Sequence, residues 1–457
     1  MIYIGLDLGT HGIKYHVLEN LDLIERGNVP IYSDLSSNYE FYEQNPEIWR
    51  ETFLELYTQF KKTYGRFIIS ISSTSGSVLP VDKNGIPVYN AIMYNDSRSS
   101  KEASFLNGIG EEKLNNLGYK FNSSFSLPKI LWVKNNLPDV YRKTKYFLHP
   151  ADFLVFLVSG QLGITDHSNA LKSGFDIIEY SWPDYIEKAG IEIEKLPKVF
   201  APTTRVYDSL ALGMTDGCSS QIATGTFEIG KSLITVGSTL VIKAVSEKIV
   251  PDKLGRFYYH LNFDSKTFLP GGASNAGGVF FEKIFDELEI EAFSEKLNSD
   301  EPSKKFVYPT IHKVERFPFS CNNFKGMSDI ENFDSKEELF KSAIEGLAYI
   351  SKYSFDLLYD FSVKFSDSVF VSGPMFNHKP IMKLFANILN RKIVRTKFND
   401  ASYGDALLAM MKDIDLDNVR RAIKIDCLVE PNRNASFFQE NYINFKKELE
   451  SKLGECK

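Results

Sequence analysis

Two short stretches of the chain have the same pattern of apolar and polar positions. Each consists of an apolar run, a glycine next to a hydroxyl residue, and a second apolar run that carries a lysine. The first stretch covers residues 1–18 and the second covers residues 232–245. Two such runs joined by a tight glycine turn predict a β-hairpin. Because the backbone N–H groups of the turn can point outward beside the hydroxyl, we expect each hairpin to form a phosphate cradle without a basic cluster.

Strand and helix patterns follow each of the two hairpins. In the first half, residues 67–73 predict a strand that ends in a run of small residues. In the second half, apolar residues recur on one helical face over 343–359. Residues 368–372 then predict a strand, and residues 381–389 predict a further helix. The charged tail from residue 442 onward is interpreted as a solvated helix.

A domain boundary is predicted near Gly230. Residues 216–225 have the pattern of a short helix that ends at a glycine, and the second hairpin pattern begins soon after it. A chain of 457 residues, with 43% hydrophobic and 25% charged residues, is long enough for two ordinary globular domains. We therefore expect an N-terminal domain over 1–230 and a C-terminal domain over 231–457, packed together because no low-complexity linker separates them.

Residues 225–232 match the nucleotide-binding pattern G-x-x-x-x-G-K-[ST] at every position. That motif binds phosphate only where a strand precedes it and a helix follows, so that the helix N-terminus faces the phosphates. Here a helix pattern precedes the motif, and β-branched alternating runs follow it. We therefore interpret the match as a turn that connects the domains.

Charge and cysteine content narrow the range of partners and compartments. A formal net charge of −6 argues against a nucleic-acid or membrane-surface partner. An anionic ligand must then be held by backbone dipoles, a metal and a few placed side chains. Four cysteines without a C-x-x-C pair are interpreted as reduced thiols of a cytoplasmic protein. We expect neither a signal peptide nor a transmembrane segment, because the N-terminus lacks a basic region and no apolar stretch is long enough.

Several motifs, taken in order along the chain, resemble those of the FGGY carbohydrate kinases, which belong to the actin-like ATPase superfamily. The resemblance covers nearly the whole chain. The first hairpin contains Asp7-x-Gly9-Thr10-x-x-x-Lys14, which resembles the first phosphate motif of the family. Residues 213–217 resemble the segment that carries the catalytic aspartate. The other matching segments are Tyr94-Asn-Asp96-Ser-Arg98, residues 165–170, Gly373-x-x-x-Asn377 and residues 403–409.

Within the family, the nearest group looks like the plant and cyanobacterial D-ribulokinase/xylulokinase-like proteins. The stretches that are similar to theirs are 74–79, 169–172, 236–243, 271–278 and 315–318. Three positions depart from the usual pattern. His11 stands where the group has a small residue, Ser372 replaces the first glycine of the adenosine-site pair, and Pro374 follows the second. These departures concern the fine geometry of the phosphate and adenosine ends rather than the class.

The resemblance implies chemistry for two acidic residues. Asp216 is implied as the general base that takes the proton of a sugar hydroxyl during phosphoryl transfer. The residues alone favour a helix N-cap for this aspartate. Asp7 is implied to hold Mg²⁺ through water, with a turn aspartate as the alternative. Both carboxylates are expected to lie at the bound substrate.

The phosphate contacts are assigned to the two hairpin turns. Thr10 and Ser238 are expected to donate hydroxyl hydrogen bonds to phosphates, while Gly9 and Gly237 let the backbone approach. The alternative is a pair of ordinary hairpin turns. Lys14 either orients the first cradle or faces solvent.

The sugar contacts depend more strongly on the resemblance. Ser75 is expected to touch the sugar, and Gly76 is expected to leave room for its carbon chain; a polar loop is the alternative. Asp96 either contacts the sugar or forms a structural ion pair with Arg98. His11 is interpreted as a solvated turn residue.

The resemblance implies an α/β fold of two actin-like, ribonuclease H-like domains, each with a mixed sheet flanked by helices, and an active site in the cleft between them. Gly373 and Asn377 are implied to border the adenosine of ATP, although a strand-to-helix turn explains them nearly as well. The implied reaction is Mg²⁺-dependent transfer of a phosphoryl group from ATP to a ketopentose, with D-ribulose as first choice and D-xylulose as second.

Alternatives to this function remain open. Gluconate, glycerol and other polyol kinases are the nearest alternatives within the class. The alternatives from other functional classes are an actin-like ATPase switch and a noncatalytic sugar sensor. We expect a cytoplasmic protein whose partners are sugar and ATP rather than nucleic acid or membrane, and a homodimer is compatible with the sequence.

Overall fold

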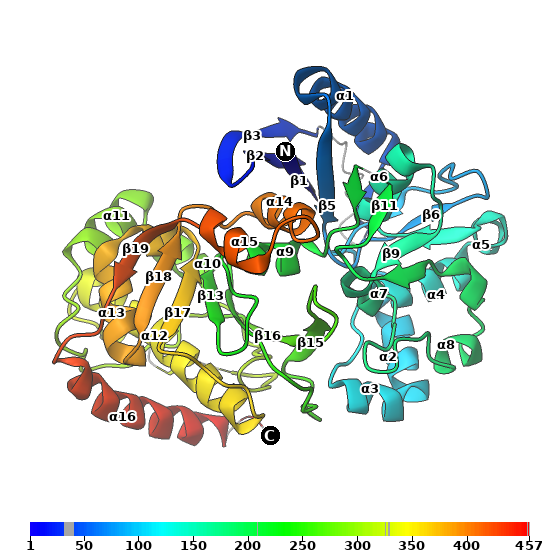
Figure 1. The fold of residues 1–457 in the computed structure, drawn as a ribbon. Helices are drawn as coiled ribbons and strands as arrows, with labels where there is room; N and C mark the ends of the chain where they lie inside the picture. The colour runs from blue at the N-terminus through cyan, green and yellow to red at the C-terminus, as the bar shows by residue number, and fades with distance from the viewer. Residues whose placement is uncertain (32–40, 208, 325, 328–329, 455, 457) are drawn as a thin grey trace. The chain divides into compact units, whose positions relative to one another are not determined.

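The computed structural model of the chain describes residues 1–31, 41–207, 209–324, 326–327, 330–454 and 456 (Figure 1). They form two compact units. Unit 1 comprises Met1–Gly225, His260–Lys266 and Phe398–Ile423, and unit 2 comprises Thr226–Tyr259, Thr267–Lys397 and Lys424–Lys457. The segment 398–423, which the sequence analysis placed in the domain 231–457, thus returns to unit 1. Residues 401–410 of this segment are buried, and no local pattern indicates which sheet they cover. The domain limit at residue 230 stays a prediction.

Unit 1 is built on a six-stranded mixed sheet with the strand order β11-β12-β5-β1-β2-β3. Its strands are β1 (Ile2–Gly9), β2 (Gly12–Glu19), β3 (Asp22–Pro30), β5 (Phe67–Ser73), β11 (Arg205–Tyr207) and β12 (Leu210–Ala211). The predicted first hairpin is present as the antiparallel pair β1–β2. The predicted strand β5 runs parallel to β1 and brings Ser72 opposite Asp7. The first cradle therefore lies at the carboxyl end of a central strand.

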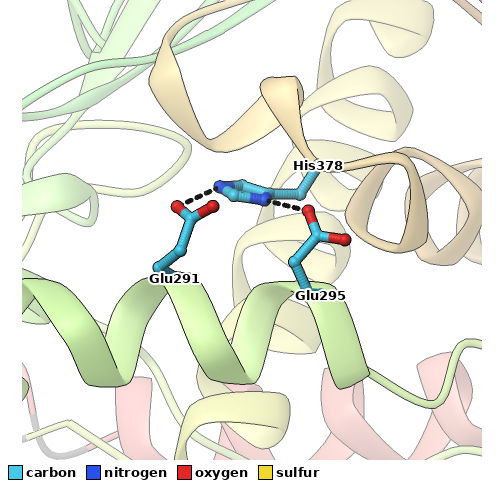
Figure 2. Close-up of side chains that lie close together, drawn as sticks. All are labelled: Glu291, Glu295 and His378. Atoms are coloured by element: carbon cyan, nitrogen blue, oxygen red, sulfur yellow. Dashed lines mark hydrogen bonds and ion pairs between the residues drawn. The ribbon is translucent and has the colours of Figure 1, made fainter.

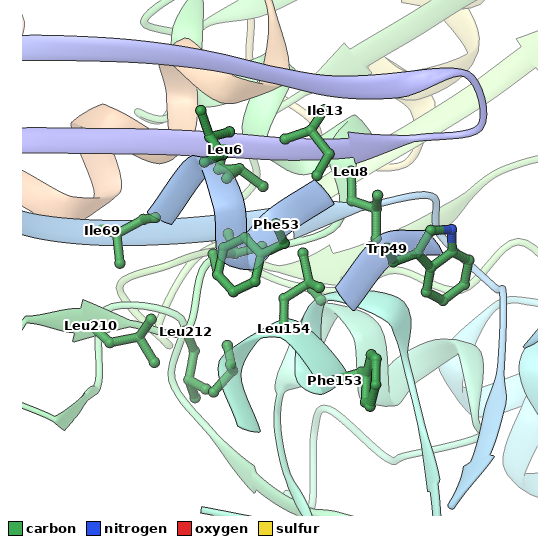
Figure 3. Packing of buried hydrophobic residues seen from close by; sticks show 14 of the residues in the cluster. Leu6, Leu8, Ile13, Trp49, Phe53, Ile69, Phe153, Leu154, Leu210 and Leu212 are labelled. Carbon is green, nitrogen blue, oxygen red and sulfur yellow. The ribbon is translucent and has the colours of Figure 1, made fainter. Parts of the chain in front are cut away.

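The side chains of β1 alternate between the two faces of this sheet. Ile4, Leu6 and Leu8 point into a hydrophobic core against α1 (Pro46–Tyr64) and α6 (Pro150–Ser159), as Figure 3 shows for Leu6 and Leu8. The main residues that those helices contribute to the core are Trp49, Phe53, Leu56, Phe60, Phe153 and Leu154. The opposite face of the sheet is covered by α9 (Asp216–Ala223) and α14 (Ala401–Met410).

Smaller strand pairs and helices complete unit 1. The pairs are β4 (Glu43–Gln44) with β7 (Ala91–Ile92), β6 (Leu79–Val81) with β8 (Tyr146–Leu148), and β9 (Ile164–Asp166) with β10 (Lys198–Phe200). The helices are α2 (Ser100–Ile109), α3 (Glu111–Leu117), α4 (Ser126–Asn136), α5 (Pro138–Lys143), α7 (His167–Lys172), α8 (Tyr185–Lys188) and α15 (Leu416–Ala422).

Unit 2 repeats the arrangement of unit 1. Its seven-stranded sheet has the order β15-β16-β14-β13-β17-β18-β19. The strands are β13 (Ser232–Val236), β14 (Leu240–Ala244), β15 (Tyr258–Leu261), β16 (Phe268–Ser274), β17 (Ser368–Ser372), β18 (Lys392–Thr396) and β19 (Ile425–Val429). As in unit 1, an antiparallel hairpin, β13–β14, has a later strand, β17, parallel to its first strand. The expected pair of α/β domains with mixed sheets is confirmed.

The helices of unit 2 are α10 (Gly278–Ile284), α11 (Glu287–Lys296), α12 (Lys336–Asp360), α13 (Lys379–Leu389) and α16 (Ala435–Leu453). Helices α12 and α13 were predicted, and α12 is longer than its pattern indicated. The predicted C-terminal helix is present, but it is solvated on one face only. Helix α16 packs against α13 and α12 and buries Phe438, Tyr442, Phe445 and Leu449, so only its outer face carries the charged residues.

Two of the four cysteines differ from the expectation of reduced thiols, whereas Cys218 and Cys427 remain thiols. Cys321 and Cys456 form a disulfide with an S–S distance of 2.09 Å and a Cα–Cα distance of 5.4 Å. The two residues are 135 positions apart in the sequence, and only the path of α16 brings them together. No local spacing could have indicated this pair.

Two exclusions made from the sequence can be compared with the structure. The P-loop-like residues 225–232 follow α9 and lead into β13, so the helix comes before the motif and the strand after it. This order is the reverse of a P-loop, as predicted. Within the described ranges, the chain contains no helix that is both long and apolar enough to cross a membrane.

Candidate active site

The first hairpin turn opens onto a cavity in unit 1. Residues Thr10 and His11 form the turn between Gly9 and Gly12, and His11 is exposed, as expected. The amide of Gln44 donates a hydrogen bond of 2.8 Å to the carbonyl of Thr10 and so anchors the turn. The adjacent cavity has a volume of about 410 Å³. It is lined by Asp7, Gly9, Thr10, His11, Gly12, Lys14, Asn28, Tyr42, Met93, Tyr94 and Asn95.

The cavity gathers four of the predicted residues, Asp7, Gly9, Thr10 and Lys14. Lys14 Nζ lies 3.5 Å from a carboxylate oxygen of Asp400. Lys14 is half exposed, which agrees in part with a solvent-facing lysine. Its ion pair also holds it beside the first hairpin turn, which agrees in part with a role in orienting that turn. Sequence reasoning missed the contribution of Asn28, for which the strand pattern of β3 contains no signal.

Asp7 and Asp216 interact with each other inside unit 1. Burial, and then repulsion from Asp216, raise the pKa of the Asp7 carboxyl to about 7. The Ser72 hydroxyl donates a hydrogen bond of 3.1 Å to Asp7 and partly offsets this effect. Two carboxylates close enough to repel each other can share a proton or be neutralised by a divalent cation.

Asp216 is the first residue of α9, and Thr215 is the N-cap. The structure thus differs from the interpretation of Asp216 as the cap itself. A carboxylate oxygen of Asp216 accepts a hydrogen bond of 2.7 Å from the backbone N–H of Gly217. This bond orients the carboxylate at the start of α9. A carboxylate beside Asp7 is the type of group that can act as a general base.

Asp96 forms a buried ion pair with Arg98, which is the structural alternative considered above. One oxygen of Asp96 accepts from Arg98 Nε at 2.8 Å, and the other accepts from Arg98 Nη2 at 2.7 Å and from the Tyr42 N–H at 2.6 Å. Arg98 also bonds Glu43 at 2.8 Å. Asp96 is fully buried, and its hydrogen-bonding capacity is largely used inside the protein. This arrangement favours a role in holding the cavity wall over direct sugar contact.

Ser75 and Gly76 lie outside the residues that line the 410 Å³ cavity. Gly76 has a φ of +86°, and a Cβ there would lie 2.0 Å from the carbonyl oxygen of Ser124. The glycine is thus required by backbone packing, which differs from the expectation that it leaves room for a sugar. The Ser75 hydroxyl oxygen is shielded from solvent and has no hydrogen-bond partner among the described groups. A shielded hydroxyl of this kind is compatible with contact to a ligand.

The second hairpin, in unit 2, has a different turn. Its residues 237–239 form a three-residue loop in which the Gly237 N–H donates to the Thr239 carbonyl at 3.1 Å. The carbonyl of Gly237 accepts from the Gly278 N–H at 2.8 Å. The Gly237 N–H is therefore used within the turn, contrary to the expectation that it points outward. A Cβ at this position would meet no atom within 4 Å, so the open side that a phosphate needs is present.

A cavity of about 820 Å³ lies next to this turn. It brings Gly237, Ser238 and Asn377 together; Gly373 does not line it. Gly373 has a φ of +111°, and a Cβ there would lie 2.0 Å from the Val236 carbonyl, so its role is close packing of β17 on β13. The full lining is Val236, Gly237, Ser238, Gly278, Phe281, Glu282, Phe285, Asp286, Glu287, Ile290, Glu291, Ser294, Pro374, Met375, Asn377 and His378. Aromatic side chains beside polar groups suit a purine ring.

His378, which sequence reasoning missed, is held between two carboxylates at the wall of the 820 Å³ cavity (Figure 2). Its Nδ1 lies 2.9 Å from Glu295, and its Nε2 lies 3.5 Å from Glu291, both on α11. A neutral imidazole has only one N–H, so it donates to one of the two carboxylates at a time. The cluster therefore places a histidine ring between two acidic side chains beside the expected adenosine site.

Comparison with known proteins now decides the family. The N-terminal domain model of the FGGY family of carbohydrate kinases matches residues 2–216, and the C-terminal domain model matches residues 264–412. This chain belongs to the FGGY family of carbohydrate kinases. It is therefore an ATP-dependent sugar phosphotransferase, as predicted, and the rival interpretation as an actin-like ATPase switch loses its support.

Individual relatives are distant but cover almost the whole FGGY kinase chain. A xylulose kinase of Staphylococcus xylosus is 23% identical over 438 residues, which cover 89% of this chain and 90% of the relative. A gluconokinase of Bacillus subtilis is 25% identical over 392 residues, which cover 76% of this chain and 74% of the relative. The structure of a xylulose kinase from Lactobacillus acidophilus superposes with a TM-score of 0.86 at 20% identity, covering 100% of this chain and 99% of that one. The closer resemblance to the plant and cyanobacterial group stays a prediction.

Proposed function

We propose that this FGGY kinase transfers the γ-phosphoryl group of ATP to the terminal hydroxyl of a ketopentose. The observation that carries the proposal is the electrostatic pair of Asp216 with Asp7, the latter lining the cavity at the first glycine hairpin. In this reaction the hydroxyl oxygen bonds to the γ-phosphorus while the bond to the β,γ-bridging oxygen breaks. ADP leaves, and the hydroxyl proton passes to Asp216. Positioning and charge stabilisation supply most of the rate enhancement.

The substrate is proposed as D-xylulose first and D-ribulose second. The sequence motifs alone favoured D-ribulose. The relatives of this chain include xylulose kinases, which supports the other ketopentose. The two sugars differ only in the configuration at one carbon, so a polar pocket separates them by which hydroxyls it leaves unpaired. Gluconate is the next candidate, because a gluconokinase is also among the relatives.

Asp7 is proposed to hold Mg²⁺ through water. The donor set fits such an ion, since Asp7 lines the cavity beside Lys14 and is repelled by the nearby carboxylate of Asp216, which does not itself line that cavity. A hydrated Mg²⁺ would relieve that repulsion and neutralise charge on the transferred phosphoryl group. Thr10 and Gly9 are proposed to meet the phosphates on the same side.

The cavity of unit 2 is proposed to take the nucleoside end of ATP. Ser238 is proposed to donate to a phosphate, Gly237 to let it approach, and Asn377 to border the adenosine. The carbonyl oxygen of the Asn377 amide accepts from Arg395 at 3.2 Å, which holds the amide group in place. We retain cytoplasmic location and a homodimer as parts of the proposal. Chromatography with light scattering tests the second of these.

A coupled ADP-release assay with Mg-ATP tests the proposed substrate. The compounds are D-xylulose, D-ribulose, ribitol, gluconate and glycerol. We expect one ketopentose to give the highest kcat/KM. Faster turnover of gluconate or glycerol would overturn the substrate assignment but not the kinase. ADP release that no compound stimulates would overturn the kinase assignment and favour a noncatalytic sensor.

The variant Asp216→Asn tests the proposed base. Loss of a general base costs roughly 100-fold to 10000-fold in kcat. We expect that loss with unchanged ATP affinity by calorimetry, because the amide keeps the size of the side chain. The control is Asp184→Asn, which changes an exposed aspartate next to α8. A kcat within about threefold of the wild type would remove Asp216 from the mechanism.

A further inference from the structure

Asp405 is a buried carboxyl that the proposed mechanism does not use. It lies in α14, all of whose residues are buried, and its own exposed fraction is 0%. Burial raises the pKa of this carboxyl well above its usual range. A buried carboxyl in a helix interior costs stability unless its neighbours hydrogen-bond it. The neighbours of Asp405 therefore indicate why it is there.

Asp405 is hydrogen-bonded to the helix that begins at Asp216. The Ser219 hydroxyl donates to one Asp405 oxygen at 2.6 Å, and Ser219 is one turn after Asp216 in α9. The other Asp405 oxygen is shielded from solvent and has no hydrogen-bond partner among the described groups. Ser72 and Asp7 are close enough to affect the pKa of Asp405, and the Ser72 hydroxyl donates to Asp7 at 3.1 Å. Asp405 thus holds α9 from a position next to Ser72 and Asp7.

The backbone around Asp405 leaves almost no space for these elements to shift. A Cβ on Gly404 would lie 1.8 Å from the Ser219 carbonyl oxygen, and a Cβ on Gly5 would lie 1.8 Å from the Ser402 carbonyl oxygen. Helix α14 therefore touches α9 on one side and β1 on the other, backbone against backbone. Two glycines remove the side chains that would hold the elements apart.

We propose that Asp405 is a positioning residue that fixes α9, and with it Asp216, relative to β1 and Asp7. The proposal rests on the proposed roles of Asp7 and Asp216. Asp405 touches no substrate; it acts by accepting the Ser219 hydrogen bond, while the two close backbone contacts fix α14 against α9 and β1. A misplacement of about 1 Å at a reacting centre can cost about 100-fold in rate, so a small shift of α9 is sufficient to impair catalysis.

The test compares Asp405→Ala, Asp405→Asn and Ser219→Ala in the full chain. Asp405→Ala is expected to lower kcat about 100-fold while KM for ATP and sugar changes little. Asp405→Asn keeps a carbonyl acceptor for Ser219 and is expected to stay within about threefold of the wild type. Ser219→Ala removes the same hydrogen bond from the other partner, so it still tests the proposal if Asp405→Ala does not fold.

A matched control comes from Glu345, a buried carboxyl of unit 2 that accepts hydrogen bonds from Ser303. Glu345→Ala is expected to lower the melting temperature without a comparable loss of kcat. Amide exchange of residues 216–223, measured by mass spectrometry, supplies a readout that needs no sugar. It is expected to accelerate in Asp405→Ala and to return to normal in Asp405→Asn.

The outcomes separate the two proposals. If the wild-type chain phosphorylates no compound, the proposed function fails, and amide exchange alone decides whether Asp405 holds α9. If the wild type is active but Asp405→Ala and Ser219→Ala keep wild-type kcat and exchange, the positioning role is overturned. The role is also overturned if Asp405→Asn loses as much kcat as Asp405→Ala. In that case, keeping an acceptor for the Ser219 hydrogen bond would make no difference to the rate.

Discussion

Replacing Asp7 with asparagine is expected to make the folded chain more stable at alkaline pH, although Asp7 is a proposed active-site residue. The folded state raises the pKa of this carboxyl from 3.8 to about 7. Because the folded chain binds the proton more tightly than the unfolded chain does, stability falls as pH rises from about 4 to about 7. A shift of about 3 units corresponds to an upper limit of about 4 kcal/mol.

In the Asp7→Asn variant the side chain at position 7 carries no charge, so its stability does not fall over this pH range for the same reason. Its stability relative to the wild type is expected to increase by about 2 kcal/mol between about pH 5.5 and about pH 8.5, both without Mg²⁺. Urea unfolding followed by tryptophan fluorescence is a suitable assay, because Trp49, Trp132 and Trp182 are the three tryptophans of the sequence and all lie in unit 1. The signal therefore reports the unit that contains Asp7.

The matched control is Glu51→Gln, an exposed change on α1. Its effect is expected to stay within about 0.5 kcal/mol at both pH values. An Asp7→Asn variant with the same relative stability at both pH values would show that burial and repulsion from Asp216 do not act on Asp7 as the structure indicates. Lower stability of the variant at the alkaline pH would refute the sign of the argument.

Two further substitutions follow from buried or clustered charges. Arg98→Ala leaves the fully buried Asp96 without its partner and is expected to cost about 3–5 kcal/mol in urea unfolding of unit 1; a cost below about 1 kcal/mol would match a surface pair instead. His378→Ala removes the ring that contacts Glu291 and Glu295 at the wall of the 820 Å³ cavity and is expected to weaken ATP binding about tenfold by calorimetry. Unchanged affinity would separate this cluster from the nucleotide.

The parts of the fold that local patterns describe were predictable. Both hairpins, the strand Phe67–Ser73 and the short helix α9 are where the alternation of apolar residues and the glycine stops indicated. Glycine-based arguments were less successful. Gly76 and Gly373 are needed for close backbone contacts with Ser124 and Val236, which depend on segments far away in the sequence.

The candidate site was predictable only in part for the same reason. Asp7, Gly9, Thr10 and Lys14 come from one hairpin, so their spacing already places them together. Other contributions depend on tertiary contacts, such as the packing of α14 on β1 and the position of His378 against α11. A recurring Ile-Ser alternation in β5 was the one local sign that Ser72 faces away from the hydrophobic core.

The return of residues 398–423 to unit 1 bears on how the chain matures on the ribosome. The face of β1 that carries Gly5 and Asp7 is completed by α14, which begins only at Ala401, whereas β1 ends at Gly9. The N-terminal lobe therefore emerges long before the helix that seals it. A fragment that ends near residue 230 would lack α14 and would leave this face of β1, next to Asp7, uncovered.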